Sequence, residues 1–163
     1  MGAMSRAEAT HWVPDRLRGR ASRLLSQLTT RSDRLINDGL ARADARKWHY
    51  AVLASLQDHG PGSQAALSRR TGIYRSDMVG VLDELTGRQL VERAPDPADR
   101  RRNLITISAR GRRRLRRLDD VLDELHDELL APLDQAERDQ FVTLLTRLLD
   151  HHSPAPDRAD GAS

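Results

Sequence analysis

Leucine residues recur at intervals of three and four positions along most of this sequence, and that spacing predicts a chain of amphipathic helices. Aromatic residues make up only 3% of the chain, so the leucines must build an aliphatic core. Cysteine is absent, which excludes a disulfide scaffold, a zinc ribbon, a thiol nucleophile and a thiol redox sensor. No apolar run approaches the roughly 18 residues that a membrane-spanning helix needs, and no signal peptide opens the chain. We therefore expect a soluble cytoplasmic protein.

The apolar spacing and the breaker residues divide the chain into helices and one β-hairpin. Two short helices joined by a turn that contains Gly72 are typical of a helix-turn-helix. A hairpin with an arginine-rich tip follows directly, so the predicted fold class is mainly α with a small β-hairpin wing. This winged helix-turn-helix is flanked by long N- and C-terminal helices. Helices are expected at 14–40, 44–58, 64–70, 75–88, 109–131 and 134–151, and strands at 90–93 and 103–107. Ser63 and Ser108 are expected to cap the helices that follow them, and Asp134 with Glu137 to form a capping box. The expected core includes Val52, Leu53, Leu56 and Val79.

The charge is unevenly distributed although the net charge is only +3. Lys47 is the only lysine among 27 basic residues, and nine arginines fall between Arg100 and Arg117, a stretch without Asp or Glu. From Asp119 onward there are 12 acidic residues and 3 arginines. A local positive block on a nearly neutral chain points to a polyanion that meets one face. The alternative is an arginine-rich solvated helix that reflects a GC-rich genome.

The middle of the chain resembles the MarR family of bacterial transcriptional regulators. The most specific part is the wing, where Asp-Pro-x-Asp-Arg-Arg stands between two predicted strands. Tyr74 departs from the family pattern, which often has a capping Asp, Asn or Ser there, and Gln89 stands where Gly commonly ends the recognition helix. The matching segments are HYAVLASL at 49–56, GPGSQAALSRRTGIYRSDMVGVLDEL at 60–85, LVER at 90–93, DPADRRRN at 96–103 and ITISARG at 105–111.

The resemblance implies double-stranded DNA as a partner, read by the helix that begins after Tyr74. Its exposed residues are expected to be Tyr74, Arg75, Ser76, Asp77 and Gly80. Arg75 and Ser76 suit bases or phosphates, Gly80 permits close backbone approach, and Asp77 either accepts from a cytosine amine or pairs with an arginine. Residues near the DNA backbone are expected to be Ser63, Gln64 and Arg69, and wing residues Asp96, Asp99, Arg100, Arg101 and Arg102.

The apolar stripes of the first and the last two helices exceed what one small winged helix can cover. Two copies would bury them as a helical core, and the resemblance likewise implies a homodimer that reads a pseudo-palindrome. The expected organisation is 1–13 as a flexible start, of which 1–3 resembles a cloning remnant, 14–43 and 109–152 as the dimerisation region, 44–108 as the DNA-binding domain and 153–163 as a disordered tail.

The resemblance also implies a pocket for a small ligand, often an aromatic anion such as a phenolic carboxylate. Aromatic side chains with cationic neighbours suit an aromatic acid. The alternative is that these aromatics are ordinary core residues. The candidates are Arg46, Trp48, His49, Tyr50 and Trp12.

No motif for catalysis or for a cofactor is present, so we expect neither an enzyme nor a cofactor. Asp123 and His126 form one possible metal-ligand pair, which is too little for a di-metal helical site, so we expect no metal. The arginines at 110–117 either reach phosphate or pair with acids of the first helix or of a second copy. The predicted function is a homodimeric repressor relieved by a small ligand. A non-specific DNA-architectural protein and a helical protein-interaction module remain alternatives.

Overall fold

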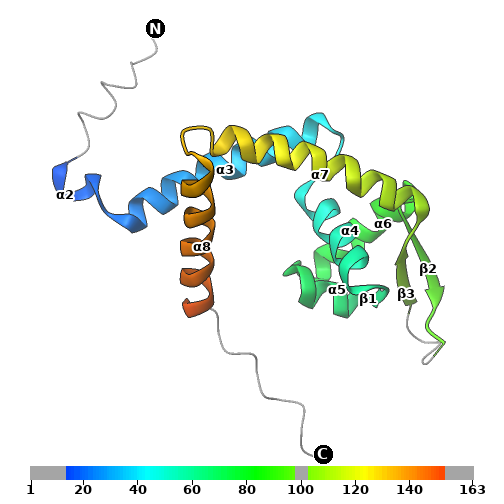
Figure 1. Cartoon of the computed structure of the whole chain (residues 1–163). Coiled ribbons are helices and arrows are strands. Elements are labelled where there is room, and N and C mark those ends of the chain that lie inside the picture. The colour runs from blue at the N-terminus through cyan, green and yellow to red at the C-terminus, as the bar shows by residue number, and fades with distance from the viewer. Residues whose placement is uncertain (1–13, 98–102, 153–163) are drawn as a thin grey trace, which may run out of the picture. The chain divides into compact units, whose positions relative to one another are not determined.

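The computed structural model describes residues 14–97 and 103–152. The described chain is mainly helical with one small antiparallel sheet, as the sequence predicts (Figure 1). It divides into two compact units, and the boundary between them in the sequence falls between Leu125 and His126. In chain order the elements are α2 (Asp15–Arg18), α3 (Ala21–Arg42), α4 (Lys47–His59), β1 (Gly62–Ser63), α5 (Gln64–Thr71), α6 (Arg75–Gly87), β2 (Val91–Pro95), β3 (Asn103–Ile107), α7 (Ala109–Leu129) and α8 (Gln135–His152).

The helix-turn-helix and the hairpin form one winged unit. The sheet has the order β1-β3-β2, and β2 pairs with β3 from Val91 opposite Ile107 to Pro95 opposite Asn103. The strand β1, which the sequence did not predict, pairs Gly62 with Ile105. This pairing ties the start of α5 to the hairpin.

A hydrophobic core holds the winged unit together. Val52, Leu53 and Leu56 of α4 are buried as predicted, and they pack with apolar side chains of α5, α6, β2 and β3. The prediction that Val79 belongs to this core is wrong, because its side chain is 46% exposed. Val79 follows Met78 by one residue, which rotates it about 100° around α6 and away from the core.

A second apolar cluster joins α3 to α7. It contains Leu40 of α3 together with Leu118, Leu122 and Leu125 of α7. The hydroxyl of Tyr50 in α4 donates to Oδ1 of Asp119 at 3.0 Å beside this cluster. These contacts connect the winged unit to the long helices that flank it in sequence.

Three of the described helices, α5, α7 and α8, begin at predicted capping residues. Ser63 accepts from the Ala66 N–H at 3.3 Å, and Ser108 accepts from the Gly111 N–H at 2.9 Å. Asp134 and Glu137 form the predicted reciprocal capping box at the start of α8, with bonds of 3.0 and 2.9 Å.

The continuous helix predicted from residue 14 to 40 is wrong, because it is interrupted between α2 and α3. Gly19 ends α2, and Arg20 is extended with φ −73° and ψ 117°. Glycine has a low helix propensity, so the apolar spacing does not carry the helix through this position.

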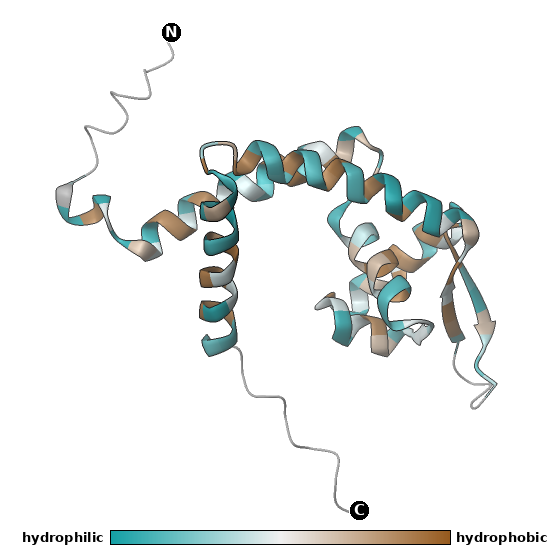
Figure 2. Ribbon diagram, viewed as in Figure 1, coloured by the Kyte–Doolittle hydropathy of each residue, from teal (hydrophilic) through white to brown (hydrophobic). Residues whose placement is uncertain are grey.

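The helices α3 and α8 each carry exposed apolar side chains. Brown segments of the ribbon in Figure 2 mark the hydrophobic positions of these helices. In α3, Leu24 is 52% exposed, and Leu25 is exposed as well. In α8 no residue is buried, and Leu149 is 69% exposed. No helix of the described residues has the length and apolar character required to cross a membrane.

Candidate nucleic-acid interface

The turn between α5 and α6 sets the angle of the second helix. Gly72 adopts the left-handed conformation with φ 71°, and its N–H donates to the Ser68 carbonyl. Ile73 is buried directly after it and anchors the turn. The Gln64 side chain then donates to the Arg75 carbonyl at 3.3 Å, which ties the start of α5 to the start of α6.

The start of α6 presents one exposed face. All five residues predicted for this face, at positions 74–77 and 80, are exposed, and the Tyr74 side chain is 79% exposed. Tyr74 makes no side-chain cap, as its departure from a capping residue suggested. The Ser76 hydroxyl donates to Oδ1 of Asp77 at 3.3 Å, so Ser76 does not cap the helix either. Val79 also lies on this face, although its apolar side chain was predicted to belong to the core.

A groove of about 560 Å³ lies between α5, α6 and the hairpin. It brings together four predicted residues, Ser63, Gln64, Arg69 and Arg75. It also contains Arg93 and Asn103, which the sequence analysis missed. Sequence spacing carries no signal for these two residues, because only the packing of β2 and β3 beside α6 places them next to Arg75.

The groove is electrostatically positive. Arg93 is neutralised by Asp83 of α6, with Nη2 to Oδ1 at 2.7 Å. Among the described residues, no carboxylate lies within 4 Å of the guanidinium of Arg69 or Arg75. Two arginines in an open groove therefore remain available to an anion.

The predicted wing residues stand between β2 and β3 in the sequence. Asp96 is half-buried just after β2. The other four wing residues, Asp99, Arg100, Arg101 and Arg102, lie outside the described residues, as does Trp12.

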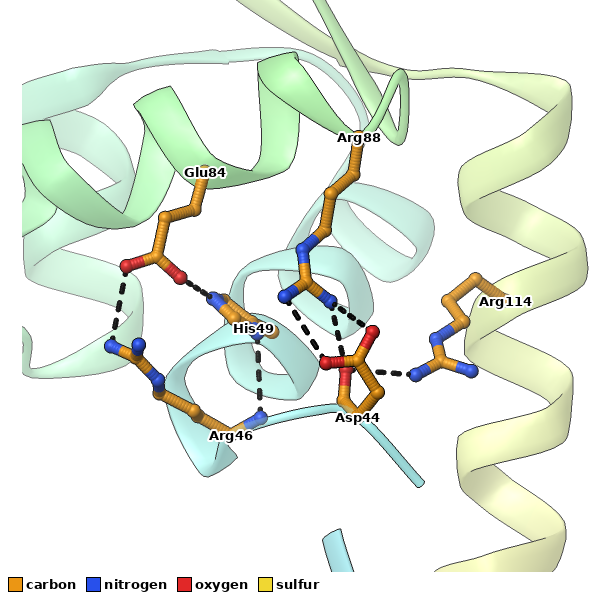
Figure 3. A network of polar contacts seen from close by, with 6 residues as sticks. All are labelled: Asp44, Arg46, His49, Glu84, Arg88 and Arg114. Atoms are coloured by element: carbon orange, nitrogen blue, oxygen red, sulfur yellow. Dashed lines mark hydrogen bonds and ion pairs between the residues drawn. The ribbon is translucent and has the colours of Figure 1, made fainter. Parts of the chain in front are cut away.

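A polar network connects the start of α4 to α6 (Figure 3). Arg46 Nη1 lies 3.2 Å from Oε1 of Glu84, and His49 Nε2 lies 3.0 Å from Oε2 of the same residue. The Arg46 N–H donates to His49 Nδ1 at 3.3 Å, so the neutral ring carries its proton on Nε2. Burial lowers the pKa of His49 below 6.5, and the bond to Glu84 partly opposes this shift.

The structure brings only some of the predicted ligand residues together. Arg46 and His49 line a small pocket of about 210 Å³ with Asp44 and Arg88. Trp48 is 40% exposed, with Lys47 Nζ 5.0 Å from its ring centre. Tyr50 instead contacts Asp119, and burial together with this bond raises the pKa of Tyr50 to about 12.

Comparison with known proteins relates this geometry to one family of regulators. The sequence profile of the MarR family matches residues 38–102. The repressor NicR of Pseudomonas putida is 30% identical over 101 residues, which are 62% of this chain and 64% of NicR. The structure of BpsR from Bordetella bronchiseptica superposes with a TM-score of 0.72 and 25% identity over 85% of this chain and 99% of BpsR. The winged unit of this chain is therefore similar in sequence and fold to the MarR family.

A MarR structure from Escherichia coli in complex with operator DNA is also similar. It has a TM-score of 0.68 and 26% identity, and the match covers 78% of this chain and 92% of that one. The chain spans slightly less than two thirds of NicR. The MarR profile covers α4, α5, α6 and β2, and thus includes the exposed face of α6 and the arginines of the groove.

Proposed function

We propose that this protein is a homodimeric, sequence-specific DNA-binding repressor whose pseudo-palindromic operator is released when a small ligand binds. The observation that carries this proposal is the exposed start of α6 beside a groove in which Arg69 and Arg75 face no carboxylate of the described residues. A helix of this kind fits the major groove of B-DNA, and its first residues reach the base edges.

Each exposed residue at the start of α6 suits a different chemical group of the DNA. Arg75 suits the two acceptors of a guanine, while Tyr74 and Val79 offer apolar surface to a thymine methyl group. Ser76 suits a phosphate or a base, and Gly80 lets the backbone approach the duplex. Asp77 accepts from a cytosine amine. Ser63, Gln64 and Arg69 position the domain on phosphates, and one of the wing arginines at 100–102 enters the minor groove.

The exposed apolar faces of α3 and α8 support dimerisation. A monomer that exposes leucines along two helices gains free energy when a second copy covers them. Residues 14–43 and 109–152 are therefore assigned to the dimer, and 44–108 to DNA binding. Two recognition helices then read half-sites about one DNA turn apart. A regulator of this kind works on the bacterial chromosome, in the cytoplasm.

The ligand is assigned to the start of α4, where Arg46 and His49 offer a cation and a polar ring beside Trp48. In the related BpsR, DNA binding is regulated by 6-hydroxynicotinic acid, which is an aromatic acid. Arg46 contacts Glu84 of α6, so a carboxylate that takes Arg46 away from Glu84 changes the support of the recognition helix. Trp12 completes the proposed set, whereas Tyr50, whose hydroxyl bonds to Asp119, does not line the pocket beside Arg46 and His49.

Duplex binding at several salt concentrations tests the proposal. The probes are the upstream region of the gene that encodes the chain and a shuffled copy of that region. We expect specific binding to exceed shuffled binding by roughly 10³-fold. Arg75→Gln should remove most of this preference, while Arg42→Gln, which removes the same charge from the last turn of α3, should leave it unchanged. Equal binding to both duplexes by the unmodified protein, followed by failure of a random-sequence selection, would support an architectural protein instead.

A further inference from the structure

Arginines converge on a second cavity, separate from the groove beside α6. This cleft has a volume of about 460 Å³. It lies where the end of α6 and the first half of α7 meet the loop between α3 and α4. Its polar lining consists of Arg88, Arg110, Arg113, Arg114, Arg117 and Asp44.

The loop between α3 and α4 holds two of these arginines in place (Figure 3). Arg88 donates to both carboxylate oxygens of Asp44, at 3.0 and 3.3 Å, and to the Asp44 carbonyl at 2.8 Å. Arg114 donates to the same carbonyl at 3.0 Å and to the carbonyl of Ala43. These two guanidinium groups are therefore oriented before any ligand arrives.

The other three arginines supply charge without a carboxylate partner among the described residues. Arg110 donates to Oε1 of Gln89 at 3.3 Å, which is a neutral acceptor. Arg113 and Arg117 lie one helical turn apart on α7, and no described carboxylate is within 4 Å of either. Asp44 is thus the only acidic residue in the lining, against five arginines.

We propose that this cleft binds a compact multivalent anion that carries carboxylate or phosphate groups. Guanidinium groups bind both kinds of group through paired hydrogen bonds, and the volume lies in the range of small-molecule sites. One acidic residue against five basic ones leaves an excess of positive charge that a single carboxylate does not neutralise. A ligand with two or more negative charges therefore fits better than a monoanion.

The position of the cleft argues against the DNA backbone as its occupant. Arg75 begins α6 and Arg88 follows its end, so about 13 residues of helix, or roughly 20 Å, separate the groove from the cleft. Leu90, which also lines the cleft, stands at the base of the hairpin, before β2 runs toward the wing tip. A duplex seated on the start of α6 and on the wing lies at the other end of these elements.

The cleft is also distinct from the pocket beside His49. Arg88 and Asp44 line both cavities, but Arg113 and Arg117 line only the cleft. An anion in the cleft connects the end of α6 to α7. Its binding does not depend on the proposed DNA-binding function and is measured directly.

Isothermal titration calorimetry on the full chain tests the site. The probes are sodium pyrophosphate and sodium citrate, with sodium acetate as the monovalent control, all at one ionic strength. We expect one saturable site per chain for pyrophosphate or citrate and none for acetate. The pyrophosphate and citrate titrations also distinguish a phosphate ligand from a carboxylate ligand.

Two double variants locate the site. Arg113→Gln with Arg117→Gln should weaken binding at least tenfold. Arg112→Gln with Arg116→Gln removes the same charge at the same spacing from the same helix, outside the cleft lining, and should change affinity less than twofold.

Three results would overturn the proposal. The first is that neither pyrophosphate nor citrate binds. The second is an equal loss of affinity in the two double variants, which would indicate diffuse charge attraction. The third is that a duplex oligonucleotide displaces the bound anion and that the variant at 113 and 117 loses duplex affinity, which would assign the cleft to DNA phosphates.

Discussion

The first turn of α7 has no room for a side chain at Gly111, and this makes a sharp test of the packing. A Cβ at this position would lie 2.1 Å from the Leu90 carbonyl oxygen and 2.8 Å from Cγ1 of Ile107. Ordinary contacts begin at 3.4 Å, so the backbone of α7 must move by about 1 Å. The Leu90 oxygen also accepts the Ser108 N–H at 3.0 Å, so this movement stretches a hydrogen bond.

The cost of Gly111→Ala follows from these contacts. Overpacking costs about 1–3 kcal/mol and the weakened hydrogen bond about 1 kcal/mol, while the higher helix propensity of alanine offsets about 1 kcal/mol. The free energy of unfolding should fall by about 2 kcal/mol. For a chain of this size the melting temperature should then fall by roughly 4–8 °C.

Gly80→Ala is the matched control, because it makes the same substitution in a helix where nothing lies within 4 Å of the new Cβ. It should raise the free energy of unfolding by about 0.5–1 kcal/mol. Thermal and urea unfolding at one protein concentration measure both variants, since the stability of a dimer depends on concentration. A Gly111→Ala protein as stable as the unmodified chain would refute the packing described here.

Three further changes test other parts of the structure. Gln89→Gly should raise the free energy of unfolding by about 1 kcal/mol in urea titrations, because Gln89 adopts a left-handed φ of 58° that glycine tolerates better. A stability equal to or lower than that of the unmodified chain would contradict this. The lowered pKa of His49 means that the unfolded chain binds a proton more readily than the folded chain, so the free energy of unfolding should fall as the pH drops below 6.5. The fall should be less steep in His49→Asn, and parallel pH profiles of the two proteins would contradict this prediction. Tyr74→Ser should raise the free energy of unfolding by about 1 kcal/mol, because serine caps α6. The same change should weaken duplex binding, and an unchanged affinity in fluorescence anisotropy would show that Tyr74 does not contact DNA.

Local signals account for what the sequence predicted. Apolar spacing located the helices, and Ser63, Ser108 and Asp134 marked helix starts because a capping side chain bonds within its own turn. Gln89 stands where Gly commonly ends the recognition helix, and its φ of 58° is the left-handed conformation that glycine adopts without strain.

Contacts between distant segments account for what the sequence did not predict. The two-residue strand β1 is too short to show a pattern, and it exists because Gly62 meets Ile105. Asp44 interacts with Arg88 and Arg114, which are 44 and 70 residues away, and no spacing rule connects such positions. Arg93 and Asn103 enter the groove only after the hairpin packs beside α6.

The proposed function requires that two copies of α6 read a specific DNA sequence. A selection from random duplexes tests this requirement without any knowledge of the regulated gene. We expect enrichment of an inverted repeat whose half-site centres lie about 10–10.5 base pairs apart, and loss of that enrichment in Arg75→Gln. Recovery of duplexes without a shared motif, or the same motif from Arg75→Gln, would contradict the proposed mode of recognition.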